Sequence, residues 1–200
     1  MTKSQIEFEA RLMIDEEKYF FIVTYFMNIY PNKHFLQNVN YYYDTDDLYL
    51  RDQHMTLRVR TINDVKTELT IRIKGNNGDE EINDGLTPRE SDLLLNQNIF
   101  PYGQVRNRLT TLPYSLDKYR RIATLFNRRL EIEFDDYIFV VDKNSYGDAV
   151  DYNIEIESKI GIEHAKEMMN HYIAQFNLPV SKEKYVGKAR RAIDEALKNS

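Results

Sequence analysis

Five short segments of the sequence alternate apolar and ionic residues with a period of two. They are residues 6–12, 57–60, 71–74, 130–133 and 154–159. Successive side chains of a β-strand point to opposite faces, so each segment would carry an apolar stripe on one face and charged groups on the other. This pattern constrains the fold more than any other feature of the chain, because it predicts a sheet with one largely ionic face.

The charges on this face are sorted by sign. Carboxylates dominate the segments at 6–12, 130–133 and 154–159, while Arg and Lys occupy those at 57–60 and 71–74. One interpretation is a half-buried sheet with its charged face in water. The alternative is a barrel with an ionic interior, because about eight strands leave room for side chains or one small ligand. Buried unpaired charges are costly, so such a lumen would hold water, or a divalent cation and a polyphosphate.

Composition narrows the class of protein. A length of 200 residues with 42% hydrophobic residues predicts a single domain over residues 1–200. A net charge of −5 argues against a general nucleic-acid binder. The absence of cysteine excludes disulfides, thiolate nucleophiles and Cys-based zinc sites. Residues 1–5 lack the apolar core of a signal peptide and no apolar run is long enough to span a bilayer, so we expect a soluble cytoplasmic protein without a membrane partner.

Local patterns predict the order of elements along the chain. We expect helices at 15–30, with Asp15 as N-cap, at 91–99, with Ser91 as N-cap, at 163–177 and at about 182–197. Strands after the first segment are expected at 39–44, 49–51, 56–61, 68–74, 115–123, 128–134, 137–142 and 152–159. The polar residues 75–85 are typical of a loop, and residues 101–113 are ambiguous. Two blocks of strands with helices between and after them favour an α+β fold with a mainly antiparallel sheet.

Several short motifs along the chain occur in the same order as the motifs of a known protein family. They are Glu7-x-Glu9-x-Arg11, Tyr42-Tyr43-Asp44-Thr45, Leu57-Arg58-Val59-Arg60, Thr70-x-Arg72-x-Lys74, Glu155-x-Glu157 and Lys188-x-x-Arg191. In this order the sequence resembles the CYTH superfamily, also called the triphosphate tunnel metalloenzymes, and in particular its short, single-domain bacterial members. The resemblance covers nearly the whole chain. It implies an α+β fold with an antiparallel eight-stranded β-barrel, or tunnel, and helices packed outside.

The resemblance also implies roles for individual residues. Metal ligands for Mg²⁺ or Mn²⁺ would be Glu7, Glu9, Asp142, Glu155 and Glu157. Phosphoryl oxygens of the substrate would be bound by Arg11, Arg58, Arg60, Arg72, Lys74, Arg120 and Lys188. The catalytic motif would be Glu7, Glu9 and Arg11. Arg11 stands where the family has Lys, and it retains the charge but cannot act as a deprotonatable amine.

We therefore expect metal-dependent hydrolysis of inorganic tripolyphosphate or of a small organic triphosphate. The small-molecule substrate would be the main partner, and the chain would act as a monomer or homodimer. Two alternatives keep the same residues. One is an adenylate cyclase that makes cyclic AMP from ATP, and the other is a polyphosphate- or nucleotide-binding module with little turnover, which the replacement at Arg11 suggests.

Overall fold

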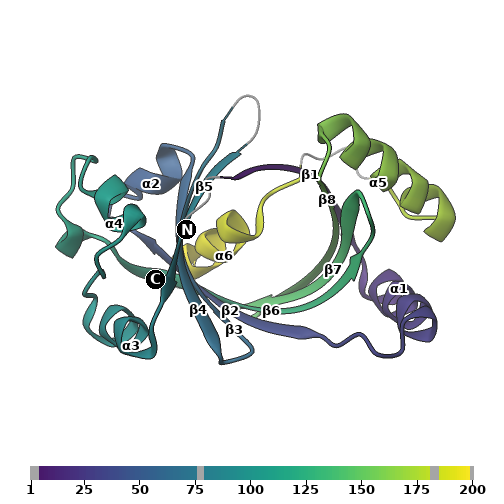
Figure 1. The fold of residues 1–200 in the computed structure, drawn as a ribbon, viewed down its shortest axis with the longest axis horizontal. Coiled ribbons are helices and arrows are strands. Elements are labelled where there is room, and N and C mark those ends of the chain that lie inside the picture. The colour runs from purple at the N-terminus through teal and green to yellow at the C-terminus, as the bar shows by residue number, and fades with distance from the viewer. Residues whose placement is uncertain (1–4, 76–78, 181–184, 199–200) are drawn as a thin grey trace. The chain divides into compact units, whose positions relative to one another are not determined.

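A computed structural model describes residues 5–75, 79–180 and 185–198, with the side chains of residues 5–7 excepted. The strands of this part of the chain are β1 (Gln5–Ile14), β2 (Leu36–Asp44), β3 (Met55–Ile62), β4 (Lys66–Ile73), β5 (Asp79–Leu86), β6 (Arg120–Glu133), β7 (Tyr137–Tyr146) and β8 (Ala149–Ser158). The helices are α1 (Glu16–Ile29), α2 (Tyr49–Asp52), α3 (Pro88–Gln97), α4 (Gln104–Leu109), α5 (Ile162–Phe176) and α6 (Lys188–Lys198). Figure 1 shows these elements.

The strand order is β1-β5-β4-β3-β2-β6-β7-β8 and closes on itself as a barrel. The described part of the chain is therefore α+β with eight strands, as the sequence predicts. Its contacts group into two compact units. The first unit comprises Met1–Ile6, Asn38–Leu125 and Ala189–Ser200, and the second comprises Glu7–Gln37 and Phe126–Lys188. The single domain over residues 1–200 stays a prediction.

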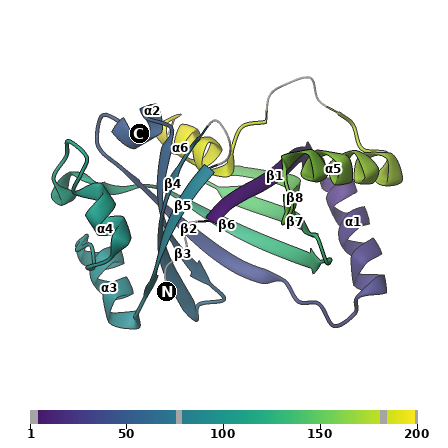
Figure 2. The same cartoon turned by 45° about the horizontal axis from the view of Figure 1, so that its top comes forward.

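In the second unit, β7 pairs antiparallel with both β6 and β8, and β8 also pairs antiparallel with β1. The apolar face of these strands packs against α1 and α5, which lie on the same side of β7 and β8 (Figures 1 and 2). Phe26 of α1 and Tyr172 of α5, for example, both contact the ring of Phe139 in β7. The expected cap of α1 is confirmed, because Asp15 accepts a hydrogen bond of 2.7 Å from the Lys18 amide. The opposite face of these strands carries the ionic residues.

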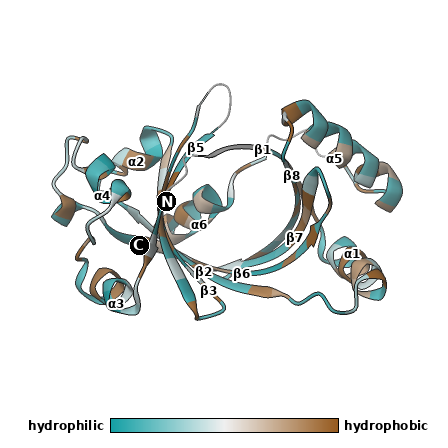
Figure 3. Cartoon of the chain, in the orientation of Figure 1, coloured by the Kyte–Doolittle hydropathy of each residue, from teal (hydrophilic) through white to brown (hydrophobic). Residues whose placement is uncertain are grey.

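In the first unit, β2, β3, β4 and β5 form an antiparallel meander. Its apolar face packs against α2, α3 and α4 through residues that include Leu57, Ile71 and Leu94. Asn63 and Asp64 both have positive φ angles, of 50° and 55°, in the three-residue turn between the paired residues Ile62 of β3 and Lys66 of β4. Figure 3 shows that hydrophobic and hydrophilic residues are interspersed along these elements, as expected for amphipathic strands and helices.

The strand predicted at 49–51 is wrong, because these residues lie in helix α2. The reason is the buried carboxylate of Asp44, which accepts hydrogen bonds from the amides of Leu50 at 2.8 Å and of Arg51 at 2.9 Å. These bonds satisfy amides that the helix itself leaves unpaired, so the chain turns where an extended strand was expected.

The loop predicted over 75–85 is also wrong in its second half. Residues 76–78 lie outside the described residues, but Asp79–Leu86 form strand β5. Its polar composition fits its position, because Glu81 and Asn83 lie opposite Arg72 and Thr70 of the ionic face of β4, while Ile82 lies opposite Ile71 on the apolar face. The residues of β5 were expected to form a loop because a strand whose polar side chains lie opposite those of a neighbouring strand can have the same composition as a loop.

Three other boundaries differ from expectation. Helix α3 begins earlier than predicted and is capped by Thr87 rather than Ser91, in a capping box with Glu90. The strands expected at 115–123 and 128–134 merge, from Arg120 onward, into the single 14-residue strand β6. The C-terminal helix begins at Lys188 instead of about 182, and residues 181–184 lie outside the described residues.

Within the described residues, no helix has the length and apolar character that a membrane span requires.

Candidate active site

Arg129 of β6 lies at the centre of the ionic face of the second unit. The strand register places it directly opposite Asp142 of β7. Its Nε and Nη2 atoms donate to the two carboxylate oxygens of Asp142 at 2.9 and 3.0 Å, and Nη2 also lies 2.9 Å from Oε2 of Glu155. Longer contacts join Nη1 to Glu157 at 3.3 Å and to Glu131 at 3.4 Å. A single guanidinium therefore binds carboxylates from β6, β7 and β8.

Two further cations bind the same carboxylates. Nζ of Lys188 donates to Oδ2 of Asp142 and lies 3.1 Å from Oε1 of Glu155. Nε of Arg11 lies 3.3 Å from the same Glu155 oxygen, and Arg11 also pairs with Glu9 of its own strand. Asp142 has an exposed fraction of 0% and Glu155 of 3%, so these ion pairs are shielded from water. Buried charges of this kind persist only when each is paired and hydrogen-bonded.

The electrostatics of the cluster favour ionised carboxylates. Burial opposes ionisation of Asp142, but the charges of Arg129 and Lys188 outweigh it and hold the pKa of Asp142 well below its usual range. Burial likewise disfavours the anion of Glu155, but Lys188, Arg11 and Arg129 together lower the pKa of Glu155 to about 2. Burial also opposes the charge on Arg129, while Asp142 and Glu155 raise the pKa of its guanidinium above the ordinary value. Asp142, Glu155 and Arg129 are therefore all ionised at neutral pH.

A layer of buried asparagines holds the carboxylates from the other side. The side-chain amide of Asn127 donates to Asp142 at 2.8 Å and to Asn144 at 3.0 Å. Asn144 donates in turn to Asn153 at 2.8 Å and to Asp151 at 2.9 Å. These neutral amides add hydrogen bonds to the cluster without adding charge, so they fix its geometry.

The other acidic residues that were expected to bind the metal lie in different surroundings. Glu9 and Glu157 lie opposite each other on β1 and β8, at the edge of the same ionic face. Glu7 belongs to β1, but its side chain is outside the described residues. Across the described side chains, no three His, Asp or Glu groups are arranged to hold a metal ion. The oxygens of Asp142 and Glu155 are directed at Arg129 and Lys188 instead.

The first unit has an ionic face of its own, in which arginines alternate with carboxylates. Arg72 donates to Asp79 at 2.9 Å, and Glu81 lies 3.8 Å from Arg58 and 4.0 Å from Arg72. Nε of Arg58 is buried and has no hydrogen-bond partner within the described residues. This face therefore holds cations in fixed positions, and one buried donor of Arg58 is available to an acceptor from a ligand.

Other cations predicted for the substrate lie in varied surroundings. Arg60 donates to Oδ1 of Asn40 at 3.0 Å and lies 3.7 Å from Glu68, so it belongs to the ionic face of the first unit. Lys74 follows the end of β4 and is exposed. The side chain of Arg120 is 60% exposed and pairs with Asp46, and its role in substrate binding stays a prediction.

Arg129, which makes ion pairs with four carboxylates among the described residues, was not expected from the sequence. Arg129 precedes the segment 130–133 by one position, and the alternation in that segment, extended backward, places Arg129 and Asn127 on the same face as Glu131. The alternation of side chains along this strand therefore already indicated that Arg129 and Asn127 belong to the ionic face. The expectation of a separate strand beginning at residue 128 hid the continuity of β6.

Comparisons with known proteins agree with these motifs. The model of the CYTH domain family matches residues 5–177. A protein of Bacillus subtilis (strain 168) named "Putative triphosphatase YjbK" is 28% identical over 175 residues, which cover 88% of each chain.

Solved structures share the fold. The crystal structure of "a putative adenylate cyclase" from Bacillus halodurans superposes with a TM-score of 0.83 at 26% identity, over 94% of this chain and 97% of that one. The Hippeastrum protein "putative adenylyl cyclase HpAC1", described with a dominant triphosphatase activity, gives a TM-score of 0.75 at 16% identity, over 90% of this chain and 92% of that one. The latter likeness concerns the fold alone. Since the family model spans both units of the structure, the chain belongs to the CYTH domain family.

Proposed function

We propose that this protein hydrolyses a triphosphate, either inorganic tripolyphosphate or a small organic triphosphate, with a divalent metal ion. Membership of the CYTH domain family and the name of the Bacillus subtilis relative support the reaction class. The observation that carries the proposal is the buried cluster of ion pairs around Asp142 and Glu155. A protein without a charged ligand gains little from burying so many ions, because apolar residues of similar volume stabilise a core at least as well.

The donor chemistry of the second unit fits the metal. Carboxylate and amide oxygens are the ligands that Mg²⁺ and Mn²⁺ prefer, and the cluster around Asp142 and Glu155 contains both kinds of oxygen. Glu7, Glu9, Asp142, Glu155 and Glu157 would hold the metal. The chemistry that the metal supplies when bound is Lewis-acid polarisation of a phosphoryl oxygen.

The cations of the protein would bind and orient the phosphoryl groups. Arg60 and Arg72 donate hydrogen bonds to Asn40 and Asp79, so their guanidinium planes are oriented before a ligand arrives. Arg58 lies 3.8 Å from Glu81. Oriented donors stabilise charge on the equatorial oxygens of a transferring phosphoryl group without reorganisation. Arg11 and Lys188 would contribute further contacts to phosphoryl oxygens, and we retain Lys74 and Arg120 as proposed substrate contacts from the family resemblance.

Product analysis with the purified full chain tests the proposal. Tripolyphosphate, ATP and thiamine triphosphate are each incubated with Mg²⁺ or Mn²⁺, and orthophosphate and cyclic AMP are measured. Orthophosphate release that stops on addition of a chelator is the expected result. Tight binding of all three compounds without orthophosphate would contradict hydrolysis and support a binding module.

Adenylate cyclisation is the second candidate, and the name of the Bacillus halodurans structure favours testing it. The described residues provide the ion-binding faces that either reaction needs. Cyclic AMP formed from ATP faster than orthophosphate would replace hydrolysis with cyclisation as the reaction of this chain.

A further inference from the structure

Lys188 binds the two carboxylates that the proposed function assigns to the metal. Its ammonium donates to Oδ2 of Asp142 and lies 3.1 Å from Oε1 of Glu155. The two oxygens therefore share one positive charge, as they would share a bound cation. In the same part of the chain Asp142 and Glu155 are buried, so these oxygens have little access to water.

Lys188 is easier to displace than the other cation that binds both carboxylates. Arg129 is 9% exposed at its side chain and is held by a bidentate pair with Asp142, whereas the Lys188 side chain is 17% exposed. A lysine ammonium is a point charge on a flexible stem and has no planar fork to fix its direction.

The position of Lys188 in helix α6 is electrostatically unfavourable. It is the first residue of α6, whose first turn contains no acidic residue. The N-terminus of a helix carries a partial positive charge, which disfavours a cation and favours an anion. The ion pairs with Asp142 and Glu155 offset this repulsion, and an alternative anionic partner would find both the ammonium and the helix terminus attractive.

We propose that the Lys188 ammonium is an internal stand-in for the divalent cation, so that metal binding to Asp142 and Glu155 requires its release. A metal ion competes with the ammonium for the same two oxygens, and the intact lysine therefore weakens metal affinity. A polyanionic substrate that binds the released ammonium favours metal binding, so the two ligands bind with positive coupling. This inference rests on the proposed function for the identity of the cation.

Manganese binding to the metal-free full chain, without any phosphate compound, tests the inference directly. Free Mn²⁺ is followed by electron paramagnetic resonance in wild type, Lys188→Met, Lys188→Arg and the control Lys166→Met. Lys166 lies on α5, is exposed and pairs with Glu163, so its loss changes the net charge equally. We expect Lys188→Met to bind Mn²⁺ at least about tenfold more tightly than wild type, because one adjacent unit charge has been removed. Lys188→Arg and Lys166→Met should stay within about twofold of wild type.

Equal or weaker Mn²⁺ binding by folded Lys188→Met would overturn the inference. Thermal unfolding of each variant verifies folding. A second measurement needs no variant: reductive methylation of wild type, read by mass spectrometry, should modify Lys188 faster after Mg²⁺ is added, while Lys166 in the same sample stays constant. An unchanged rate at Lys188 would likewise overturn it. Neither measurement uses turnover, so a failed triphosphatase assay and a failed inference are distinguished.

Discussion

Arg129 makes ion pairs with carboxylates from three strands of the second unit. The guanidinium has a geometric advantage over an ammonium here, because its planar fork matches the two oxygens of Asp142. Removal of the fork would leave Asp142 and Glu155 buried with less compensating charge. At the residue scale, the ionic face depends on this one side chain more than on any residue that the sequence analysis selected.

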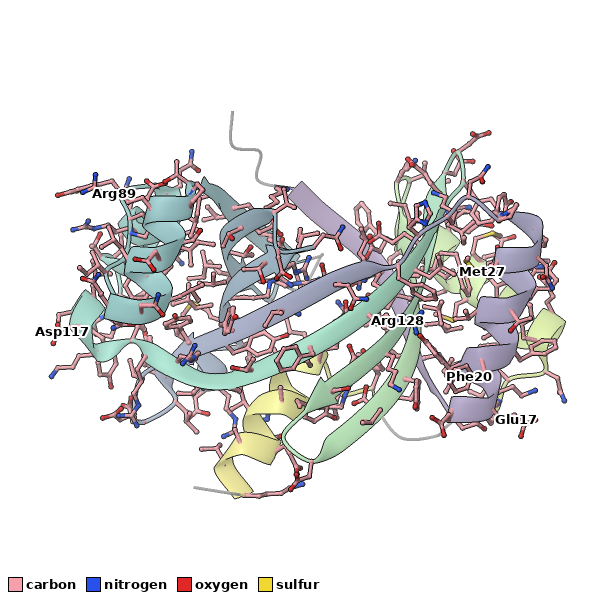
Figure 4. The ribbon with its side chains drawn as sticks, turned by 90° about the horizontal axis from the view of Figure 1, so that it is seen from below. Glu17, Phe20, Met27, Arg89, Asp117 and Arg128 are labelled. Carbon is pink, nitrogen blue, oxygen red and sulfur yellow. The ribbon has the colours of Figure 1, made fainter. Side chains whose placement is uncertain are left out.

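Arg129→Met should therefore destabilise the protein strongly. Loss of one partner from a buried ion pair costs about 3–5 kcal/mol, and urea denaturation at neutral pH measures it. The matched control is Arg128→Met, on the opposite face of the same strand (labelled in Figure 4). Arg128 is exposed and lies 3.7 Å from the ring centroid of Phe35, so its loss should cost no more than about 1 kcal/mol. Equal effects of the two substitutions would contradict the central role of Arg129.

The lowered pKa values of Asp142 and Glu155 predict how stability depends on pH. Both groups bind fewer protons in the folded protein than in the unfolded chain, so their contribution is complete above the unfolded values, near about pH 4. It is lost as the pH falls toward the folded value, which is about 2 for Glu155. The free energy of unfolding, measured in urea at a series of pH values, should decrease below about pH 5. A constant free energy between pH 5 and 3 would show that these ion pairs add no stability.

At the scale of elements, carboxylates of two strands fix the start of two short helices. Asp44 ends β2 and caps α2, and Asp84 of β5 accepts from the amides of Gln104 and Val105 at the start of α4. The close approach of Asp84 also explains Gly103, because a Cβ there would lie 2.4 Å from the carboxylate. Short helices of this kind gain little from their own hydrogen bonds, so their caps carry much of their stability.

Asp44→Ala should destabilise the junction of β2 and α2. It leaves the amides of Thr45, Leu50 and Arg51 buried without an acceptor, which costs about 2–3 kcal/mol in thermal or urea unfolding. The control is Asp46→Ala, which removes an exposed ion pair with Arg120 and should cost less than about 1 kcal/mol. If Asp44→Ala unfolded no more easily than Asp46→Ala, the capping role would be wrong.

Alternation and helix caps were sufficient to predict most elements. The segments that combine an apolar stripe with charges became β1, β3, β4, β6 and β8, because burial of one face fixes a strand regardless of the chemistry of the other. β5 could not be predicted in this way, since its polar residues owe their pairing to Arg72 and Thr70 on a neighbouring strand. The ion pairs of Arg129 depend on the register between strands, and those of Lys188 on the approach of a helical residue to β7 and β8, neither of which the pattern of a single strand contains.

At the scale of the whole molecule, the match of the CYTH domain family to residues 5–177 supports the proposed triphosphatase function. The double substitution Glu7→Gln with Glu9→Gln should abolish metal-dependent orthophosphate release, because it removes two of the proposed ligands. The control replaces two exposed carboxylates of α5, Glu163→Gln with Glu167→Gln, and should keep wild-type turnover. Unchanged turnover in the Glu7 and Glu9 variant would remove these residues from the catalytic assignment.

The most direct test of the account is a crystal of the full chain grown with tripolyphosphate and Mn²⁺, with anomalous scattering used to locate the manganese. We expect an anomalous peak within bonding distance, about 2.0–2.3 Å, of carboxylate oxygens of Asp142 or Glu155, with the Lys188 ammonium moved off them. A well-occupied manganese bound elsewhere, with Lys188 still paired to both carboxylates, would contradict it.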